Sequence, residues 1–301
     1  MFRLFGETSI NFMGSRKYAY IISGVLIVAS VISLVVHGGP RLGIDFAGGT
    51  VIQVLITPRQ SADVVRSALA RAGLAKAEMQ SIGEEGGYLF RLKEGETEGD
   101  AFTVLKGAIQ EEVPGAEVEL RREETVGPKI GRELRGKAVW AVLWVLAGIL
   151  VYVGWRYELT FALGAVVALF HDVFVTLGFL SFTNIEISLP VVAALLTIGG
   201  YSINDTIVLF DRIREQNRLL RREQFEKIIN ISVNRVLSRT VLMSLTTLFA
   251  VFSLLILGGE VIHDFALTVF VGVIAGTYSS IYVASALALD IHGPEKRKTR
   301  R

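Results

Sequence analysis

The chain has 301 residues, of which 51% are hydrophobic, and a positive mean hydropathy of +0.49. Values this high are unusual for a water-soluble globular protein and favour a membrane protein. The formal net charge of +2 does not by itself identify partners, and the absence of cysteine excludes disulfides, thiolate metal sites and cysteine nucleophiles.

Six stretches are long and apolar enough to cross roughly 30 Å of hydrocarbon as helices. They are residues 18–36, 138–155, 159–181, 187–210, 240–257 and 265–289. The first stretch is too long for a signal-peptide core and lacks a clear cleavage site before His37, so we interpret it as an uncleaved anchor. The sequence therefore predicts an α-helical polytopic membrane protein with six transmembrane helices.

Lysine and arginine are concentrated on one side of these predicted spans. The basic stretches are residues 1–17, 211–239 and 290–301. The short connections 182–186 and 258–264 contain neither residue type. Because basic residues mark the cytoplasmic side, we expect both termini and the basic loop 211–239 in the cytoplasm, where the loop contacts lipid headgroups rather than nucleic acid. Residues 37–137 are then extracytoplasmic, since long domains cross largely regardless of charge.

Residues 37–137 are polar enough to form a small soluble domain with connecting segments. Their patterns predict, in order, a strand, a helix, two strands, a helix and a strand. These elements are residues 50–56, 61–72, 75–82, 88–92, 98–113 and 116–120, with a turn at 83–87. The order βαββαβ is that of a ferredoxin-like α+β domain. It has no catalytic cluster, so we expect it to act by contact or hinging.

The most informative residue is Asp205, because it lies inside the apolar stretch 187–210. An ionisable group in a membrane span is costly and indicates an ion or substrate pathway with a partner nearby. Arg239, at the start of the next predicted span, is the candidate partner. Burial disfavours the charged form of a carboxyl group and a guanidinium favours it, so one ion pair that forms and breaks could switch protonation. The alternatives are a static interhelical pair and, for Arg239, a snorkelling interface residue.

His171 and Asp172 lie near the middle of the predicted span 159–181. Histidine titrates near physiological pH, so this pair could extend a proton relay. The alternative is a polar contact that only holds this span against the next one.

Three polar residues beside Asp205 could line the same hydrated path. They are Ser202, Asn204 and Thr206. Alternatively, they satisfy backbone groups around Gly199 and Gly200, a pair that we expect to loosen the helix into a mobile element.

Small and hydroxyl residues on the last two predicted spans are typical of helix packing. Thr240, Ser244 and Thr247 share one face below Arg239. The residues Thr268, Gly272, Gly276 and Ser280 repeat every four positions, a stripe that lets helices approach closely. The four histidines show no metal-binding spacing, so no metal site is expected.

Several motifs resemble those of the SecD/SecF family of protein-export membrane proteins. The first follows the first span and contains Gly43, Asp45, Phe46, Gly48 and Gly49. Further matches are residues 126–134, 171–173, 200–215, 238–247 and 276–284, and those in the spans resemble SecF rather than SecD proteins. Together they cover nearly the whole chain in order. Met243 departs from the pattern, since many relatives carry threonine there, which argues against a hydroxyl relay at that position.

The resemblance implies a non-enzymatic subunit of the bacterial Sec protein-export machinery in the cytoplasmic (inner) membrane, related to the resistance-nodulation-division superfamily. It implies use of the proton gradient to promote late translocation of preproteins, with protons as the coupling ion and no cofactor. By position, Asp205 and Arg239 match the intramembrane aspartate and arginine implicated in proton movement. The implied partners are SecD, the SecYEG translocon, YajC, YidC, the translocating preprotein and membrane lipid, but not nucleic acid.

Three other functions were weighed against the sequence. A noncatalytic scaffold that stabilises the translocon would need neither Asp205 nor Arg239. A proton-coupled small-molecule exporter would need a roomy substrate pocket in its soluble domain, which is small here. An intramembrane aspartyl protease is disfavoured, because Asp172 and Asp205 lack the expected flanking motifs.

Overall fold

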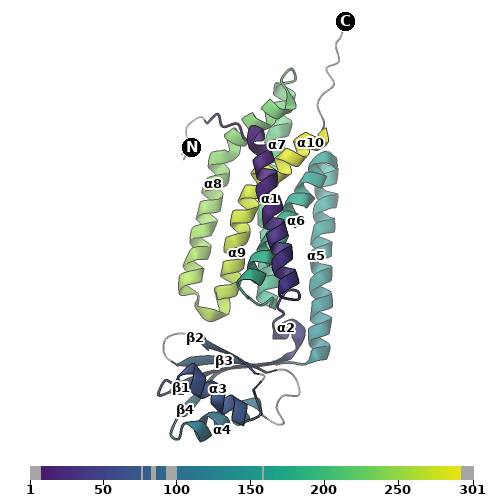
Figure 1. Ribbon diagram of the computed structural model, residues 1–301. Helices are drawn as coiled ribbons and strands as arrows, with labels where there is room; N and C mark the ends of the chain where they lie inside the picture. Colours follow the sequence, from purple (N-terminus) through teal and green to yellow (C-terminus); the bar gives the residue numbers. More distant parts are fainter. Residues whose placement is uncertain (1–7, 76, 83–85, 93–99, 158, 293–301) are drawn as a thin grey trace. The chain divides into compact units, whose positions relative to one another are not determined.

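The computed structural model describes residues 8–75, 77–82, 86–92, 100–157 and 159–292 (Figure 1). The chain divides into two compact units. The larger unit comprises Met1–Arg41 and Trp140–Arg301, and the smaller unit comprises Leu42–Val139. The basic residues of the C-terminal tail, which helped to predict the orientation, lie outside the described residues.

Six helices in the described residues are long and apolar enough to span a membrane, which confirms the predicted polytopic fold. The first five are α1 (Arg16–Val36), α5 (Pro128–Arg156), α6 (Leu159–Phe182), α7 (Leu189–Leu219) and α8 (Phe225–Leu257). The sixth is built from α9 (Gly259–Ser279), a π-helical segment η2 (Ser280–Ala284) and α10 (Ser285–His292). Figure 1 shows α1, α6, α7, α8 and α9 running alongside one another in the larger unit, with α5 at its edge.

Several helices extend beyond the apolar stretches that predicted them. Helix α7 continues past residue 210 to Leu219 and α8 begins at Phe225, so the basic segment 211–239 is largely helical rather than a loop. Helix α5 begins at Pro128, a residue type that the first helical turn accommodates. Hydropathy marks only the apolar part of a helix, whereas the backbone continues through polar residues that also favour helix.

Small residues allow the inner helices to approach one another closely. Gly272 of α9 lies against Ile198 of α7, and a Cβ added at Gly276 would lie 3.1 Å from Ser202 Cβ. A Cβ at Gly164 of α6 would lie 2.9 Å from the carbonyl oxygen of Ala284. The predicted small-residue stripe therefore packs within this chain, against α7.

Polar contacts from α8 and α10 hold the N-terminal end of α1. Met13, in the short 3-10 helix η1 (Met13–Ser15) before α1, is fully buried, and its N–H donates to Asn230 Oδ1 at 3.0 Å. Arg16 forms ion pairs with Glu226 at 3.6 Å and Asp290 at 3.4 Å. The beginnings of α1 and α8 and the end of α10 therefore lie at the same end of the bundle.

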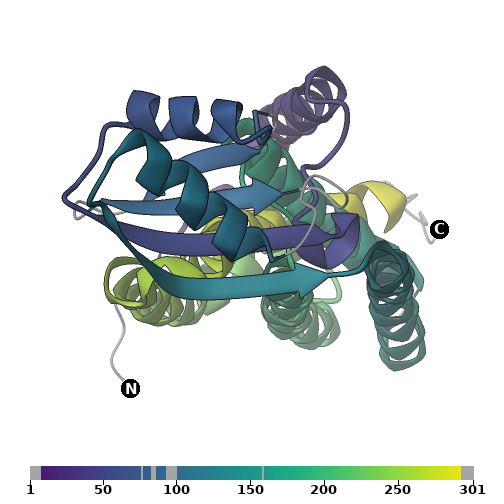
Figure 2. The same ribbon diagram turned by 90° about the horizontal axis from the view of Figure 1, so that it is seen from below.

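The smaller unit has the predicted βαββαβ order. Its elements are β1 (Gly49–Thr57), α3 (Ala62–Arg71), β2 (Glu78–Ile82), β3 (Gly87–Leu92), α4 (Ala101–Glu112) and β4 (Glu117–Val126). The antiparallel sheet has the order β2-β3-β1-β4, and Figure 2 shows α3 and α4 side by side on one face. This confirms the ferredoxin-like α+β prediction.

The core of the smaller unit follows the alternation of β1. Ile52, Val54 and Ile56 are fully buried and cluster with Leu69 of α3 and Leu105 of α4. β4 runs further than the predicted 116–120, because its charged second half still pairs with β1 up to Val126. Parts of the predicted turn 83–87 and the first residues of the predicted helix 98–113 lie outside the described residues.

The two predicted family motifs of the smaller unit meet where the chain enters and leaves it. Phe46 is buried in a short helix, α2 (Ile44–Ala47), which also contains Asp45 in its first turn. Gly48 has a φ of 80°, and a Cβ there would lie 3.1 Å from Pro128 Cα. A Cβ at Gly131 would lie 3.1 Å from Phe46 O, so glycine is needed for this contact.

We predict that Gly131→Ala destabilises the smaller unit by about 1–3 kcal/mol, because the added methyl group would be forced into the backbone of the first motif. Gly136→Ala on the same helix is the matched control, since a Cβ there meets nothing within 4 Å. Amide hydrogen exchange of β1 and β3 in the full chain should accelerate in the first variant only. Equal exchange in both variants would contradict the proposed contact.

Candidate functional site

Asp172 is the centre of a buried polar cluster that joins three helices. It lies on α6 and is fully buried. Its Oδ2 accepts hydrogen bonds from Ser202 Oγ of α7 at 2.6 Å and from Ser279 Oγ of α9 at 2.7 Å. These lengths are typical of hydroxyl donors to a charged acceptor. Of the two interpretations of Asp172, a contact that holds α6 against α7 is therefore present, and it also includes α9.

Close helix packing and a helical irregularity position the donors. A Cβ at Gly276 would lie 3.1 Å from Ser202 Cβ, so this glycine lets the serine of α7 approach α9 closely. Ser279 is the last α-helical residue before the π-helical segment η2. π-Helical turns inside α-helices occur frequently at functional sites. The expected loosening at Gly199 and Gly200 is absent, because α7 is a continuous α-helix in which Gly199 packs against Leu169.

The imidazole of His171 lies within hydrogen-bond distance of the same carboxylate. It is 3% exposed, and its Nδ1 lies 3.0 Å from Asp172 Oδ1. Its ring centroid is 6.0 Å from that of Tyr278, whose hydroxyl donates to Ala19 O of α1 at 2.8 Å. Within the described residues, Nε2 of His171 has no hydrogen-bond partner. His171 is therefore attached to the cluster through Nδ1.

Asp205 lies close to this cluster on α7, three residues after Ser202 and therefore on the same side of the helix. It is 4% exposed, and its Oδ2 has no hydrogen-bond partner among the described residues. Thr206 is also buried, and its hydroxyl donates to Ser202 O at 3.1 Å. A carboxyl oxygen without a donor in a membrane span is costly, which makes Asp205 a candidate functional group.

Two predicted site residues lie away from the cluster. Asn204 is exposed, because consecutive residues of a helix point in directions about 100° apart. Arg239 is exposed on α8, and it forms no ion pair with Asp205 in the part of the chain that the structure describes. The partnership of Arg239 with Asp205 therefore stays a prediction.

A second polar chain, not predicted from the sequence, crosses the same helices. Tyr201 Oη of α7 donates to Ser244 Oγ of α8 at 3.1 Å, and Ser244 shares a hydrogen bond of 2.7 Å with Thr277 of α9. Tyr201 and Thr277 both lie within the motif matches 200–215 and 276–284, so the family resemblance was the sequence signal that could have indicated them. Among the described residues, no group of histidine, aspartate and glutamate could hold a metal ion.

Comparisons with known proteins support the sequence resemblance. The family model described as protein export membrane protein SecD/SecF, C-terminal, matches residues 106–293, and the SecD/SecF GG motif model matches residues 33–57. A protein translocase subunit SecF from Calditerrivibrio nitroreducens is 45% identical over 297 residues, covering 97% of each chain. The Escherichia coli O157:H7 subunit SecF is 41% identical and covers 95% of this chain and 89% of the relative.

Solved structures give the same result. The chain aligns with the crystal structure of SecDF, a translocon-associated membrane protein from Thermus thermophilus, with a TM-score of 0.86 and 39% identity. The alignment covers 95% of this chain and 39% of the SecDF chain. A SecDF structure in a super-membrane-facing form aligns with a TM-score of 0.72 and 38% identity, over 97% of this chain and 40% of that one.

We predict that Ser202→Ala and Ser279→Ala each destabilise the helical unit by about 0.6–2 kcal/mol, because each removes one donor from the buried carboxylate. The double variant should differ from the sum of the two, since both serines share one acceptor oxygen. Thermal unfolding of the purified protein in nanodiscs measures both effects. Ser253→Ala, an exposed serine of α8, is the control. Strict additivity would show that the serines do not act through Asp172.

Proposed function

Because the chain belongs to the SecD/SecF family of protein-export membrane proteins, we propose that it uses the proton gradient to promote late translocation of preproteins. It acts as the SecF subunit together with SecD in the bacterial cytoplasmic membrane. The observation that carries this proposal is the buried pair of acids, Asp172 and Asp205, near the middle of the helical unit. Ionisable groups at such positions are retained where they serve an ion pathway.

Protonation of Asp172 changes how many hydrogen bonds it can accept. The ionised carboxylate is an acceptor only, whereas the protonated acid has one donor and less acceptor capacity. Its two donors come from α7 and α9, so loss of either bond loosens one helix from α6. A proton that reaches this carboxylate therefore changes helix packing directly.

The π-helical segment η2 gives α9 a second possible arrangement. Conversion of such a segment to regular helix moves the chain by about one residue, or about 1.5 Å along the axis. A shift of that size would break the 2.7 Å bond between Ser279 and Asp172. The protonation state of Asp172 and the conformation of η2 would then change together, as in a two-state element.

Asp205 and Arg239 control proton access in this proposal. Arg239 stays charged at all physiological pH values, so it acts by position and not by releasing a proton. Its exposed side chain is free to move toward or away from the buried carboxyl group of Asp205. One charge that crosses 100 mV yields about 2.3 kcal/mol, so a few protons could reverse a two-state population that needs about 5.5 kcal/mol.

The proposed partner is SecD. The similarity to a solved SecDF chain, of which this chain covers 39%, supports SecD as that partner. Helices α5 and α8 are only 6% and 17% buried in their most apolar windows, which leaves surface for a partner and for lipid. We further propose the SecYEG translocon, YajC and YidC as the wider assembly, with both termini of this chain in the cytoplasm.

We predict that Asp205→Asn removes most of the gradient-dependent part of preprotein export, by at least about tenfold, because the side chain can no longer ionise. The measurement is export into energised inverted vesicles that contain SecD and this chain, with and without an uncoupler. Asn204→Ala, an exposed neighbour on the same helix, should export normally.

Immunoblotting must show equal amounts of each variant in the vesicles. If Asp205→Asn vesicles keep the full uncoupler-sensitive export, proton coupling through Asp205 is wrong. Near-normal export by Arg239→Met as well would support the noncatalytic scaffold instead.

A further inference from the structure

Apolar side chains separate Asp205 from the end of α7. Leu209, Phe210 and Ile213 follow Asp205 along this helix, and each is at most 2% exposed. Residues four apart lie on the same side of a helix, so Leu209 and Ile213 continue the side that carries Asp205. They belong to one buried hydrophobic cluster with residues of α6 and α8. The carboxyl group is therefore closed off from water in this direction.

An aromatic pair between α6 and α7 forms part of this barrier. The ring centroids of Phe161 and Phe210 lie 4.8 Å apart, and Tyr157, just before α6, meets Phe210 at 6.3 Å. Phe210 is fully buried and Phe161 is 8% exposed. Because each ring comes from a different helix, the contact exists only while α6 and α7 stay close. Apolar constrictions that exclude water are one form of gate in membrane proteins.

A buried amide lies on the outer side of the aromatic pair. Gln216 follows Ile213 by three residues, so it lies on the same side of α7. It is 1% exposed, and its Nε2 has no hydrogen-bond partner among the described residues. A buried donor of this kind is normally satisfied by water when protein supplies no acceptor. Polar groups therefore lie on both sides of the apolar barrier, the amide outside and Asp205 inside.

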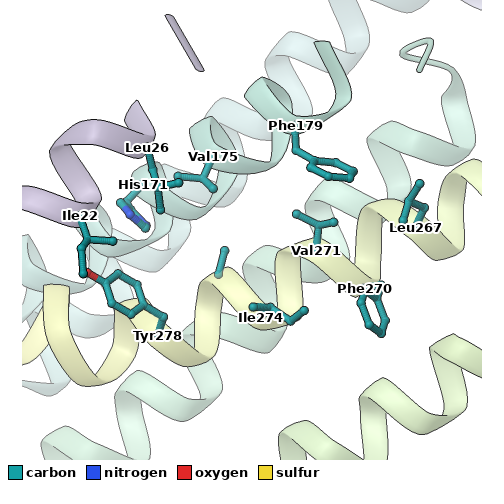
Figure 3. Close-up of a pocket in the computed structure, with 11 residues that line it drawn as sticks. Ile22, Leu26, His171, Val175, Phe179, Leu267, Phe270, Val271, Ile274 and Tyr278 are labelled. Carbon is teal, nitrogen blue, oxygen red and sulfur yellow. The ribbon is translucent and has the colours of Figure 1, made fainter. Parts of the chain in front are cut away.

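The groove between α1, α6 and α9 does not have the properties of a proton path (Figure 3). Figure 3 shows Val175 and Phe179 of α6 and Val271 and Ile274 of α9 along it. Only apolar atoms reach its surface, although His171 is among the residues that line it. Proton relays in membranes need ionisable or hydrated groups. The side of α7 that carries Asp205 and Gln216 meets this requirement better.

We propose that Phe161 and Phe210 form a gate on the proton path between Asp205 and the aqueous phase at the end of α7, and that Gln216 lines its aqueous side. This inference rests on the proposed proton-coupled function. Phe161 and Asp172 lie about three turns apart on the same side of α6. The ring pair and the hydrogen bond from Ser202 to Asp172 therefore join the same two helices. Loss of that bond on protonation releases α6 from α7 and lets the rings separate.

Water access through the gate can be measured with an introduced thiol, because the chain has no cysteine. Thr206→Cys places the thiol next to Asp205, at a position that is 1% exposed. The protein is tested with SecD in inverted vesicles, whose cytoplasmic face points outward. Adding Phe210→Ala should raise the reaction rate with a membrane-impermeant cationic thiosulfonate at least about tenfold, because truncation leaves a space at the constriction. Phe161→Ala replaces this variant where it does not fold.

Two control variants separate the gate from a general loss of stability. Leu180→Ala truncates a fully buried side chain at the other end of α6, so it should destabilise the bundle and change the rate at Thr206→Cys less than about twofold. Gln216→Cys places the thiol outside the gate. Its rate should change less than about twofold on adding Phe210→Ala, because the barrier lies further in.

Proton movement is measured separately, as passive flux into proteoliposomes that contain SecD and this chain. Phe210→Ala should raise this flux at least about fivefold, because the apolar barrier no longer excludes water. Asp205→Asn in the same chain should return the flux to the wild-type level, since the path leads through that carboxyl group.

The gate is wrong if neither phenylalanine variant accelerates labelling at Thr206→Cys, or if Leu180→Ala accelerates it equally. An equal rise at Gln216→Cys would place the barrier further out and also contradict it. A flux that Phe210→Ala does not raise, or that persists with Asp205→Asn, would show that protons do not use this opening. The export measurement distinguishes the two proposals: full uncoupler-sensitive export by Asp205→Asn refutes the proposed function, whereas lost export with unchanged labelling refutes the gate alone.

Discussion

The need to satisfy one carboxylate inside an apolar bundle determines how the helices pack. Asp172 receives its two hydroxyl donors from α7 and α9, so these helices must both come within hydrogen-bond distance of α6. Only small residues at the crossings permit this, which explains Gly272 and Gly276 on α9 and Gly164 on α6. Without those glycines the donors could not reach the acid, and an acid without donors would be expelled from the core or kept neutral.

Close glycine contacts also hold together the first and last segments of the smaller unit. The smaller unit joins the bundle through the segment before α2 and through α5, and the contacts of Gly48 with Pro128 and of Gly131 with Phe46 bring those two segments together. Arg41, just before this point, is held to the bundle by its ion pair with Glu186 at 3.1 Å. The chain therefore enters and leaves the smaller unit through two segments that lie against each other within that unit.

Sequence patterns predict this architecture better than they predict the site. Hydropathy identified the spans and alternation identified the βαββαβ order, because both depend on local periodicity. Ser279 was missed because it lies 107 residues from Asp172, and no local pattern reports such a contact. The Asp205 and Arg239 pair was inferred from neighbouring spans, but spacing along the chain does not specify which way a side chain points. Arg239 is exposed, while Asp205 is buried.

The exposed helices divide into one that suits lipid and one that suits a protein partner. Helix α5 exposes Trp140 and Trp144 in the first half of its apolar part, residues 138–155, and Trp155 at the end of that part, and aromatic residues are enriched near the two interfaces of a membrane. Helix α8 exposes no tryptophan but carries Arg239 at the edge of its apolar part. A guanidinium at that depth is costly against hydrocarbon and acceptable against a polar protein surface. The charge therefore supports the proposal that α8, rather than α5, offers the surface for SecD.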